Sequence, residues 1–217
     1  MVKIKYDDKV VMRVEQGKRR NNLKGLFDSQ IKILEDRNVP ELIIAELQDK
    51  KSFVLDKASR MTIGKGNIPF LPIISSAYLG YYGLMSMVKI ELKSGHTSII
   101  NPILIKDQIQ TPTNGLYYIF DVEDGESTRN NSPESVIQTF EEQSRSPLIA
   151  DEIVNLCIIT DVLYRHYVYA IGSRFGNFDK VPAVYLDGFS GFPELGWLYI
   201  YHSGDHWGSP SCGIRRA

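Results

Sequence analysis

Apolar residues recur at three- and four-residue steps after Asn22, the pattern of an amphipathic helix with one buried face. The apolar positions are Leu23, Leu26, Phe27, Ile31 and Leu34. Pro40 suits the first turn of a second helix, which places Leu42, Ile43 and Leu47 on one face. Residues 51–61 continue this helix or form a third. The pattern therefore predicts an N-terminal helical hairpin.

The pattern changes after Gly64–Asn67 to one that is typical of strands. Residues 68–74 contain two prolines, which exclude a helix interior or a central strand and predict a buried, extended segment. Residues 117–122 form the clearest predicted strand. Further strands are predicted over residues 87–92, 97–100, 181–186 and 195–201. Residues 203–217 are predicted to be a loop.

Two Ser-Pro pairs are typical helix starts, because the hydroxyl caps the helix and proline fits its first turn. Ser132-Pro133 predicts one helix. Ser146-Pro147 predicts a second and longer helix that ends near Gly172. The apolar stripe of the longer helix is predicted to be Ile149, Ile153, Leu156, Cys157, Leu163 and Tyr167.

Helices and strands come in blocks rather than in regular alternation, which favours the α+β class over a doubly wound parallel sheet. We expect a mixed, largely antiparallel sheet with one long packed helix, preceded by the helical hairpin. Charge suggests a division, since residues 1–60 carry a net charge of +4 and residues 61–217 one of −5. We therefore expect an N-terminal helical region over residues 1–60 and an α+β domain over residues 61–217.

Composition restricts the partners and the location. The net charge of −1 creates no field that would attract nucleic acid or anionic lipid. The first residues lack the apolar stretch of a signal peptide, and no run of about 20 apolar residues spans a membrane. Two cysteines without a repeated spacing form neither a disulfide framework nor a zinc module. We expect a soluble cytoplasmic protein without a cofactor.

The C-terminal segment gathers the residues with the clearest catalytic potential: Cys212 with His202 and His206. A neighbouring base or a positive environment would make the thiol of Cys212 a nucleophile. The same residues would also suit a metal, but Gly204 disfavours the helical turn that would bring both histidines to one face. A loop that packs Trp207 onto the domain is the structural alternative.

A second group consists of residues that suit an anion: Arg165, His166, Arg174 and Arg215. Guanidinium groups bind carboxylate or phosphate with two parallel hydrogen bonds, and histidine titrates near neutral pH. The alternative is a solvated helix face on which Asp161 and Arg165 form an ordinary ion pair.

Three further patterns favour structure over function. The two N-terminal helices have the spacing of a helix-turn-helix, but the acidic residues of the second helix would repel phosphate, so a hairpin for packing or dimerisation is favoured. Gly172–Gly176 follows a predicted helix instead of leading into one, unlike a phosphate-binding loop. The acidic run at residues 121–126 lacks the spacing of a calcium loop.

Five strings are familiar as a set: Ile68–Pro72, Tyr117–Gly125, Arg165–Tyr167, Gly172–Arg174 and Trp207–Gly213. They resemble a prokaryotic family known only as a domain of unknown function, over about residues 68–215. The resemblance implies no activity, but it supports residues 61–217 as one unit.

Two classes of function remain. The first is a binding or regulatory protein for a small-molecule or protein ligand, using the aromatic residues around 78–82 and 197–207. The second is a hydrolase or transferase that uses Cys212 with His202 or His206, assisted by Arg165 or Arg174. A homo-oligomer formed through the N-terminal helices is compatible with either class.

Overall fold

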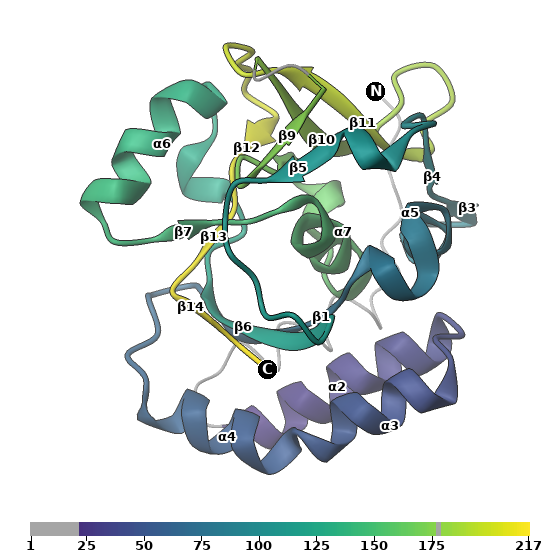
Figure 1. Ribbon diagram of the computed structural model, residues 1–217, viewed down its shortest axis with the longest axis vertical. Helices are drawn as coiled ribbons and strands as arrows, with labels where there is room; N and C mark the ends of the chain where they lie inside the picture. The colour runs from purple at the N-terminus through teal and green to yellow at the C-terminus, as the bar shows by residue number, and fades with distance from the viewer. Residues whose placement is uncertain (1–21, 177–178) are drawn as a thin grey trace.

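A computed structural model describes residues 22–176 and 179–217 and confirms the α+β class. Figure 1 shows the N-terminal helices at one end, a small sheet above them, a central helix, and a larger sheet at the other end. The first 21 residues of the predicted helical region lie outside the described residues.

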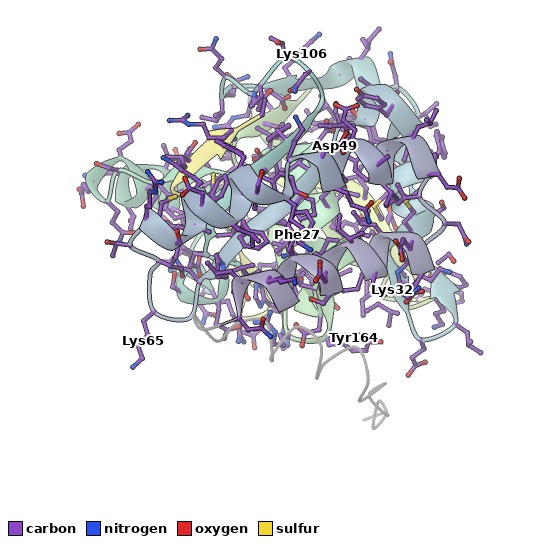
Figure 2. All side chains as sticks on the ribbon, turned by 90° about the horizontal axis from the view of Figure 1, so that it is seen from below. Phe27, Lys32, Asp49, Lys65, Lys106 and Tyr164 are labelled. Atoms are coloured by element: carbon purple, nitrogen blue, oxygen red, sulfur yellow. The ribbon has the colours of Figure 1, made fainter. Side chains whose placement is uncertain are left out.

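The helical hairpin is confirmed and has a third helix. Its helices are α2 (Leu23–Asp36), α3 (Glu41–Asp49) and α4 (Lys51–Arg60). The Asn22 side chain caps α2 by accepting a hydrogen bond from the Gly25 amide, at 2.8 Å. Seen from below, the three helices lie side by side across one face of the molecule (Figure 2).

The helical layer covers a three-stranded sheet in the order β1 (Ile68–Ile74), β6 (Leu116–Val122) and β14 (Ile214–Arg216). Strand β1 is an edge strand, which explains how it accommodates two prolines. The Phe27 ring of α2 stacks on Tyr118 of β6 with centroids 5.9 Å apart. Two polar links add to this packing: Gln30 donates to the Phe70 carbonyl at 2.8 Å, and the Tyr118 hydroxyl donates to the Leu47 carbonyl at 3.1 Å.

The second sheet has five strands in the order β12, β8, β10, β11 and β4. The bounds are β12 (Trp207–Gly208), β8 (Tyr167–Tyr169), β10 (Lys180–Leu186), β11 (Pro193–Tyr199) and β4 (His96–Thr97). The antiparallel pair β10–β11 confirms the two predicted closing strands. Helix α6 (Pro133–Glu142), capped by Ser132 as predicted, packs on one face of this sheet through Val136 and Phe140.

Short elements connect these layers. They are α5 (Ser76–Met87), the hairpin β2 (Lys89–Ile90) and β3 (Lys93–Ser94), η1 (Pro102–Leu104), β5 (Ile105–Asp107), η2 (Glu126–Thr128), β7 (Ser146–Pro147), η3 (Val162–Tyr164), β9 (Ser173–Phe175) and β13 (Ser211–Cys212). Strand β5 pairs with β9, and β7 pairs with β13.

The prediction of one helix from Ser146 to Gly172 is wrong. Helix α7 spans only Ala150–Ile159, and η3 and β8 follow it. Thr160 ends the helix with an extended backbone (ψ 173°) and returns its hydroxyl to the Leu156 carbonyl. All ten residues of α7 are buried between the two sheets, so the helix has no exposed polar face whose period would mark where it ends.

The prediction that residues 203–217 form a loop is also wrong. This segment supplies β12, β13 and β14, and Ile214 pairs with Phe120 in the middle of β6. Gly208 shows how tightly the segment packs, because a Cβ atom there would lie 2.1 Å from the Gly125 carbonyl oxygen.

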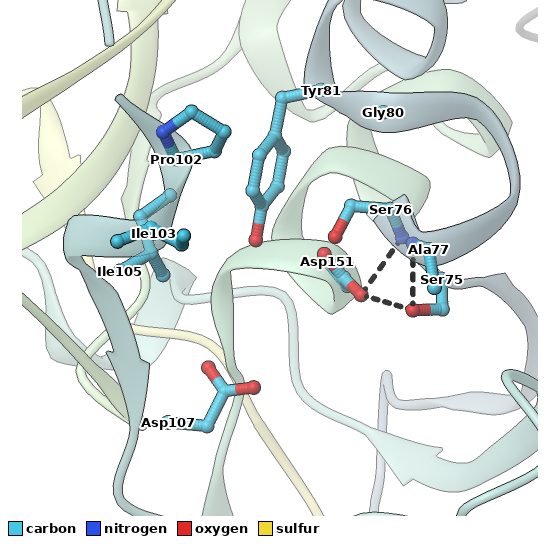
Figure 3. Close-up of a pocket in the computed structure, with 10 residues that line it drawn as sticks. All are labelled: Ser75, Ser76, Ala77, Gly80, Tyr81, Pro102, Ile103, Ile105, Asp107 and Asp151. Carbon is cyan, nitrogen blue, oxygen red and sulfur yellow. Dashed lines mark hydrogen bonds between the residues drawn. The ribbon is translucent and has the colours of Figure 1, made fainter. Parts of the chain in front are cut away.

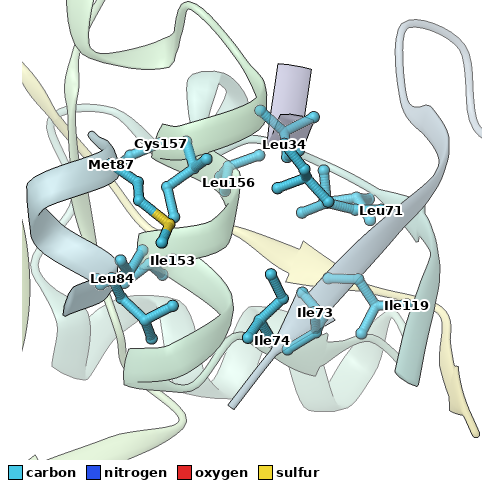
Figure 4. Close-up of a cluster of buried hydrophobic side chains, with 14 of the residues drawn as sticks. Leu34, Leu71, Ile73, Ile74, Leu84, Met87, Ile119, Ile153, Leu156 and Cys157 are labelled. Carbon is cyan, nitrogen blue, oxygen red and sulfur yellow. The ribbon is translucent and has the colours of Figure 1, made fainter. Parts of the chain in front are cut away.

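One hydrophobic core runs through both predicted parts of the chain. Figure 4 shows its centre, where Leu34 of α2 and Leu71 of β1 lie near Leu156 of α7. The linker after α4 is also held, since the Asp121 carboxylate accepts hydrogen bonds from the Gly64 amide and the Asn67 side chain, both at 2.7 Å. The division at residue 60 therefore stays a prediction that a cleavage experiment must test.

Candidate functional site

The strongest candidate site is a pocket of about 370 Å³ between α5, the η1–β5 segment and the start of α7. Its lining residues, which define the α5 pocket, are Ser75, Ser76, Ala77, Gly80, Tyr81, Pro102, Ile103, Ile105, Asp107 and Asp151 (Figure 3). One wall is apolar, while two carboxylates, a phenol and two serines supply its polar groups.

The local sequence explains the shape of the α5 side of the pocket. Ser75 caps the helix, and its hydroxyl accepts a hydrogen bond from the Ala77 amide at 3.2 Å. Gly80 interrupts the helix with φ 63° and ψ 165°, a conformation that a residue with a side chain adopts only with strain. The interruption lies at the pocket wall, beside Tyr81.

Asp151 is the central polar residue of the pocket. It lies in the first turn of α7 and is 7% exposed. Its Oδ2 atom accepts hydrogen bonds from the Ser75 hydroxyl at 2.8 Å and from the Ser76 amide at 3.0 Å. Its Oδ1 atom is buried and has no hydrogen-bond partner among the described residues. Such an acceptor costs about 1–3 kcal/mol when it stays unpaired.

Tyr81 reaches into the same space from α5. Figure 3 shows its hydroxyl pointing toward Asp151 and Ser76. Burial, followed by the negative charge of Asp151, raises the pKa of Tyr81 well above its ordinary value, so the phenol keeps its proton at neutral pH. A side-chain interaction between the Tyr81 hydroxyl and Asp151 adds to this shift, although the contact with Oδ1 falls short of the geometry of a hydrogen bond.

Asp107 faces the pocket from β5 (Figure 3). The Ser173 hydroxyl donates to its Oδ1 atom at 2.6 Å and accepts from the Ala150 amide at 2.9 Å, which ties β5 to the start of α7. Desolvation raises the pKa of Asp107, and the charges of Asp151 and Glu152 add to the effect. The residue as a whole is exposed at the rim, so water tempers this shift.

A buried polar network lies beneath the pocket. Glu152 is fully buried and receives hydrogen bonds from Arg215 at 2.6 and 2.7 Å and from the Tyr117 hydroxyl at 3.0 Å. Asn155 exchanges hydrogen bonds with the Ile74 backbone at 2.9 and 3.1 Å. Each of these side chains has its hydrogen-bond partners within the protein. The network therefore fixes α7 against β1 and β14 and does not face a ligand.

The three predicted catalytic residues occupy different environments. Cys212 is fully buried in β13, so its predicted accessibility is wrong. Burial raises the pKa of its thiol to about 12, and the charged groups that act on it are Arg215, Glu152, Arg145 and Asp121. In the part of the chain that the structure describes, no hydrogen bond joins Cys212 to either histidine.

The histidines are engaged elsewhere. His202 Nδ1 bonds to the Tyr169 hydroxyl, and its ring meets Trp207 with centroids 5.4 Å apart. The His206 side chain is 67% exposed beside Asp205. Within residues 22–176 and 179–217, no group of three or more His, Cys, Asp or Glu side chains is placed to hold a metal ion.

The predicted anion-binding residues are divided among three places. Arg165 and His166 lie close together, but both contact acidic side chains. The Arg165 guanidinium lies 2.7 Å from Asp124 Oδ2, and His166 Nδ1 lies 3.1 Å from Glu126 Oε2. Arg174 on β9 donates to the carbonyls of Ile171 and Ser173. Arg215 is committed to the buried Glu152.

Three aromatic residues of the predicted binding surface lie on β11 or just after its end. Trp197 and Tyr199 are exposed by 37% and 40%, and Tyr201 by 62%. Much of this surface contacts other side chains, since Trp197 stacks on Phe175 at 5.9 Å and lies 3.9 Å from the Lys180 ammonium. Tyr199 in turn stacks on Tyr201 at 5.1 Å.

A second hollow, of about 570 Å³, lies between α2 and α3. Its lining residues are Glu35, Asn38, Val39, Pro40, Glu41, Ile44, Ala45 and Gln48. Among the described residues, none of the buried unpaired side-chain atoms belongs to this hollow. The α5 pocket is therefore the better candidate.

Sequence reasoning missed the α5 pocket. Ser75-Ser76 before an apolar segment is a helix-cap signal that predicts the start of α5. No local pattern relates Asp107 to Asp151, because only the packing of β5 against α7 brings them to one pocket.

Fold and site together define an α+β protein with one small polar pocket as its leading candidate site. The chain belongs to a family of unknown function, DUF5701, whose model matches residues 36–217. This match confirms the resemblance found in the sequence and extends it to α3 and α4. No curated protein and no solved structure matches the chain. In the described residues, no helix has the length and apolar character needed to cross a membrane.

Proposed function

We propose that this protein binds a small polar molecule in the α5 pocket and does not transform it. The observation that carries the proposal is Asp151, a residue of the pocket lining whose buried Oδ1 atom has no hydrogen-bond partner among the described residues. A ligand that donates a hydrogen bond to Oδ1 would recover the free energy that the unpaired acceptor costs.

The size and the lining of the pocket agree with this role. Its volume of about 370 Å³ is at the small end of the range for ligand sites, about 300–1,000 Å³. Pro102, Ile103 and Ile105 supply apolar contact, while Asp107 and Tyr81 add polar groups near Asp151. An apolar wall with a few convergent polar groups is the usual composition of a binding pocket.

A role without catalysis is favoured over an enzyme that uses Cys212. A thiol nucleophile needs access to its substrate and a lowered pKa. The burial of Cys212 and its raised pKa oppose both requirements.

We also propose a cytoplasmic location and a prokaryotic source. Cys157 and Cys212 are both free, which suits a reducing compartment. The prokaryotic source rests on the resemblance of the sequence strings alone.

A fragment screen by NMR tests the binding role. Small polar fragments at millimolar concentration should shift the backbone amide signals of Ser76, Gly80 and Asp151. Ala77→Phe should block the pocket, because Ala77 lines it and is exposed, so that the larger side chain is tolerated.

The matched control is Ala45→Phe, which places the same side chain in the hollow between α2 and α3. We expect this control to leave fragment binding unchanged. A screen in which no fragment shifts the pocket amides, or in which Ala77→Phe has no effect on the shifts, would contradict the proposed function.

A further inference from the structure

We propose that the ligand of the α5 pocket is a small organic cation, a primary amine whose ammonium group binds between Asp151 and Asp107. This inference rests on the proposed binding role and names the chemical class of the ligand. The ligand class is inferred from two sets of groups in the pocket: those that already form hydrogen bonds within the protein, and those that do not.

The backbone donors and the Ser75 hydroxyl at the start of α5 are already used. The N-terminus of a helix attracts anions, because its first amides lack partners within the helix. Here the Ser76 amide and the Ser75 hydroxyl both donate to Asp151 Oδ2, and the Ala77 amide donates to Ser75. Asp151 thus takes the place that a bound anion would occupy.

Beside the hydroxyls of Ser76 and Tyr81, the charged group that remains is an acceptor. Asp151 lines the pocket and is 93% buried, since its exposed fraction is 7%, and its Oδ1 atom is buried without a hydrogen-bond partner among the described residues. An acceptor in this position requires a donor, and an ammonium group is the donor that also supplies charge.

The charge of the lining has a single sign. The ten lining residues include two carboxylates and neither lysine, arginine nor histidine. Lys106 lies between Ile105 and Asp107 on β5, so its side chain points to the opposite face of the strand and extends into solvent (Figure 2). The buried Arg215 forms its ion pair with Glu152. A cation therefore meets attraction in this pocket, and an anion meets repulsion.

The rest of the ligand must be short and apolar. Ala77, Pro102, Ile103 and Ile105 form the non-polar wall, and a volume of about 370 Å³ holds a small aliphatic chain or ring. The non-polar wall and the volume of the pocket demand no hydrogen bond from this part of the ligand. The polar end of the ligand therefore decides which ligands bind.

Three probes of equal length separate the ligand classes: n-butylamine, 1-butanol and butyrate. Each is titrated at pH 7.5 into the full chain, and the amide signals of Ser76, Gly80 and Asp107 are followed by NMR. We expect saturable shifts with butylamine, binding of butanol at least tenfold weaker, and no pocket shifts with butyrate.

Two variants test the carboxylates, and a third is their control. Asp151→Asn keeps an oxygen that accepts from Ser75 and Ser76 but presents a donor to the pocket, so butylamine binding should fall at least tenfold. Asp107→Asn, on an exposed residue, should weaken butylamine about threefold and serves if the first variant does not fold. Asp56→Asn on the exposed face of α4 should leave binding unchanged.

The outcomes also separate this inference from the binding role on which it rests. If butanol or butyrate binds the pocket as tightly as butylamine, the ligand is not a cation, although the binding role survives. If magnesium or calcium chloride alone shifts the same amides, the pocket is a metal site and the amine inference is wrong. If neither the three probes nor any fragment shifts these amides, both proposals fail.

Discussion

Replacing Arg215 tests whether the C-terminal strand is held by a buried ion pair. In Arg215→Met the long apolar side chain retains much of the packing but removes every hydrogen bond of the guanidinium group. These bonds reach both carboxylate oxygens of Glu152, at 2.6 and 2.7 Å, and the Pro147 carbonyl at 2.8 Å. The substitution would leave Glu152 charged and fully buried in α7.

The expected loss follows from the burial of both partners. The side chains of Arg215 and Glu152 are 7% and 0% exposed. Burial acts to lower the pKa of Arg215, but the charge of Glu152 outweighs it and raises this pKa above its ordinary value. Breaking a buried pair by removing one partner costs about 3–5 kcal/mol, because the other charge stays buried without compensation. We therefore expect Arg215→Met to lower the free energy of unfolding by that amount.

The assay is urea denaturation followed by circular dichroism, which gives the free energy of unfolding and its dependence on urea. The double variant Arg215→Met with Glu152→Gln removes both charges and should recover part of the loss. Its change should therefore be smaller than the sum of the two single changes. Arg216→Met is the matched control, since Arg216 is exposed and should change the stability by less than about 0.5 kcal/mol.

A loss below about 1 kcal/mol for Arg215→Met would refute this reasoning. Such a result would mean that water reaches Glu152, or that β14 detaches from β6 at little cost. Additive single changes in the double variant would refute the direct coupling of the two side chains.

Four further predictions concern the core, the linker and the thiols. Leu163→Ala should cost about 2–5 kcal/mol in urea denaturation, because Leu163 is 4% exposed; a change below about 0.5 kcal/mol would place it outside the core. Asp121→Asn should destabilise the protein at pH 7: although burial acts to raise the pKa of Asp121, hydrogen bonds from Gly64, Asn67 and Arg145 lower it. A carboxylate with a lowered pKa stabilises the fold at pH values above the pKa of about 3.9 that aspartate has in the unfolded chain. The difference in the free energy of unfolding between Asp121→Asn and the native protein should therefore shrink as the pH falls below about 4; a difference that does not change with pH would exclude this cause. Iodoacetamide at pH 7 should label Cys157 and Cys212 only after unfolding, as mass spectrometry would show, because both thiols are buried with raised pKa values; rapid labelling of native Cys212 that His202→Ala slows would restore the catalytic hypothesis. Limited proteolysis should cut near residues 62–67 and leave a folded fragment of about 150 residues if the predicted division holds, whereas unfolding after cleavage would make the helices part of one domain.

The sequence alone determined the elements whose signals are local. Ser132-Pro133 starts α6, because a hydroxyl cap and a proline act within one turn. The apolar face of residues 23–34 becomes the buried face of α2, and the run of apolar and aromatic residues after Gly115 becomes β6. The family strings also lie in the sequence, and the match over residues 36–217 confirms them.

Tertiary structure decided the features that depend on distant partners. Residues 150–159 are buried on every side and residues 167–169 are too few to show a period, so tertiary packing makes the first a helix and the second a strand of the five-stranded sheet. The polar C-terminal segment has the local pattern of a loop, but Ile214 pairs with β6 and the buried Cys212 pairs with Ser146 of β7. Asp107 and Asp151 line one pocket because Ser173 links β5 to the start of α7, and no local pattern relates residues so far apart in the chain.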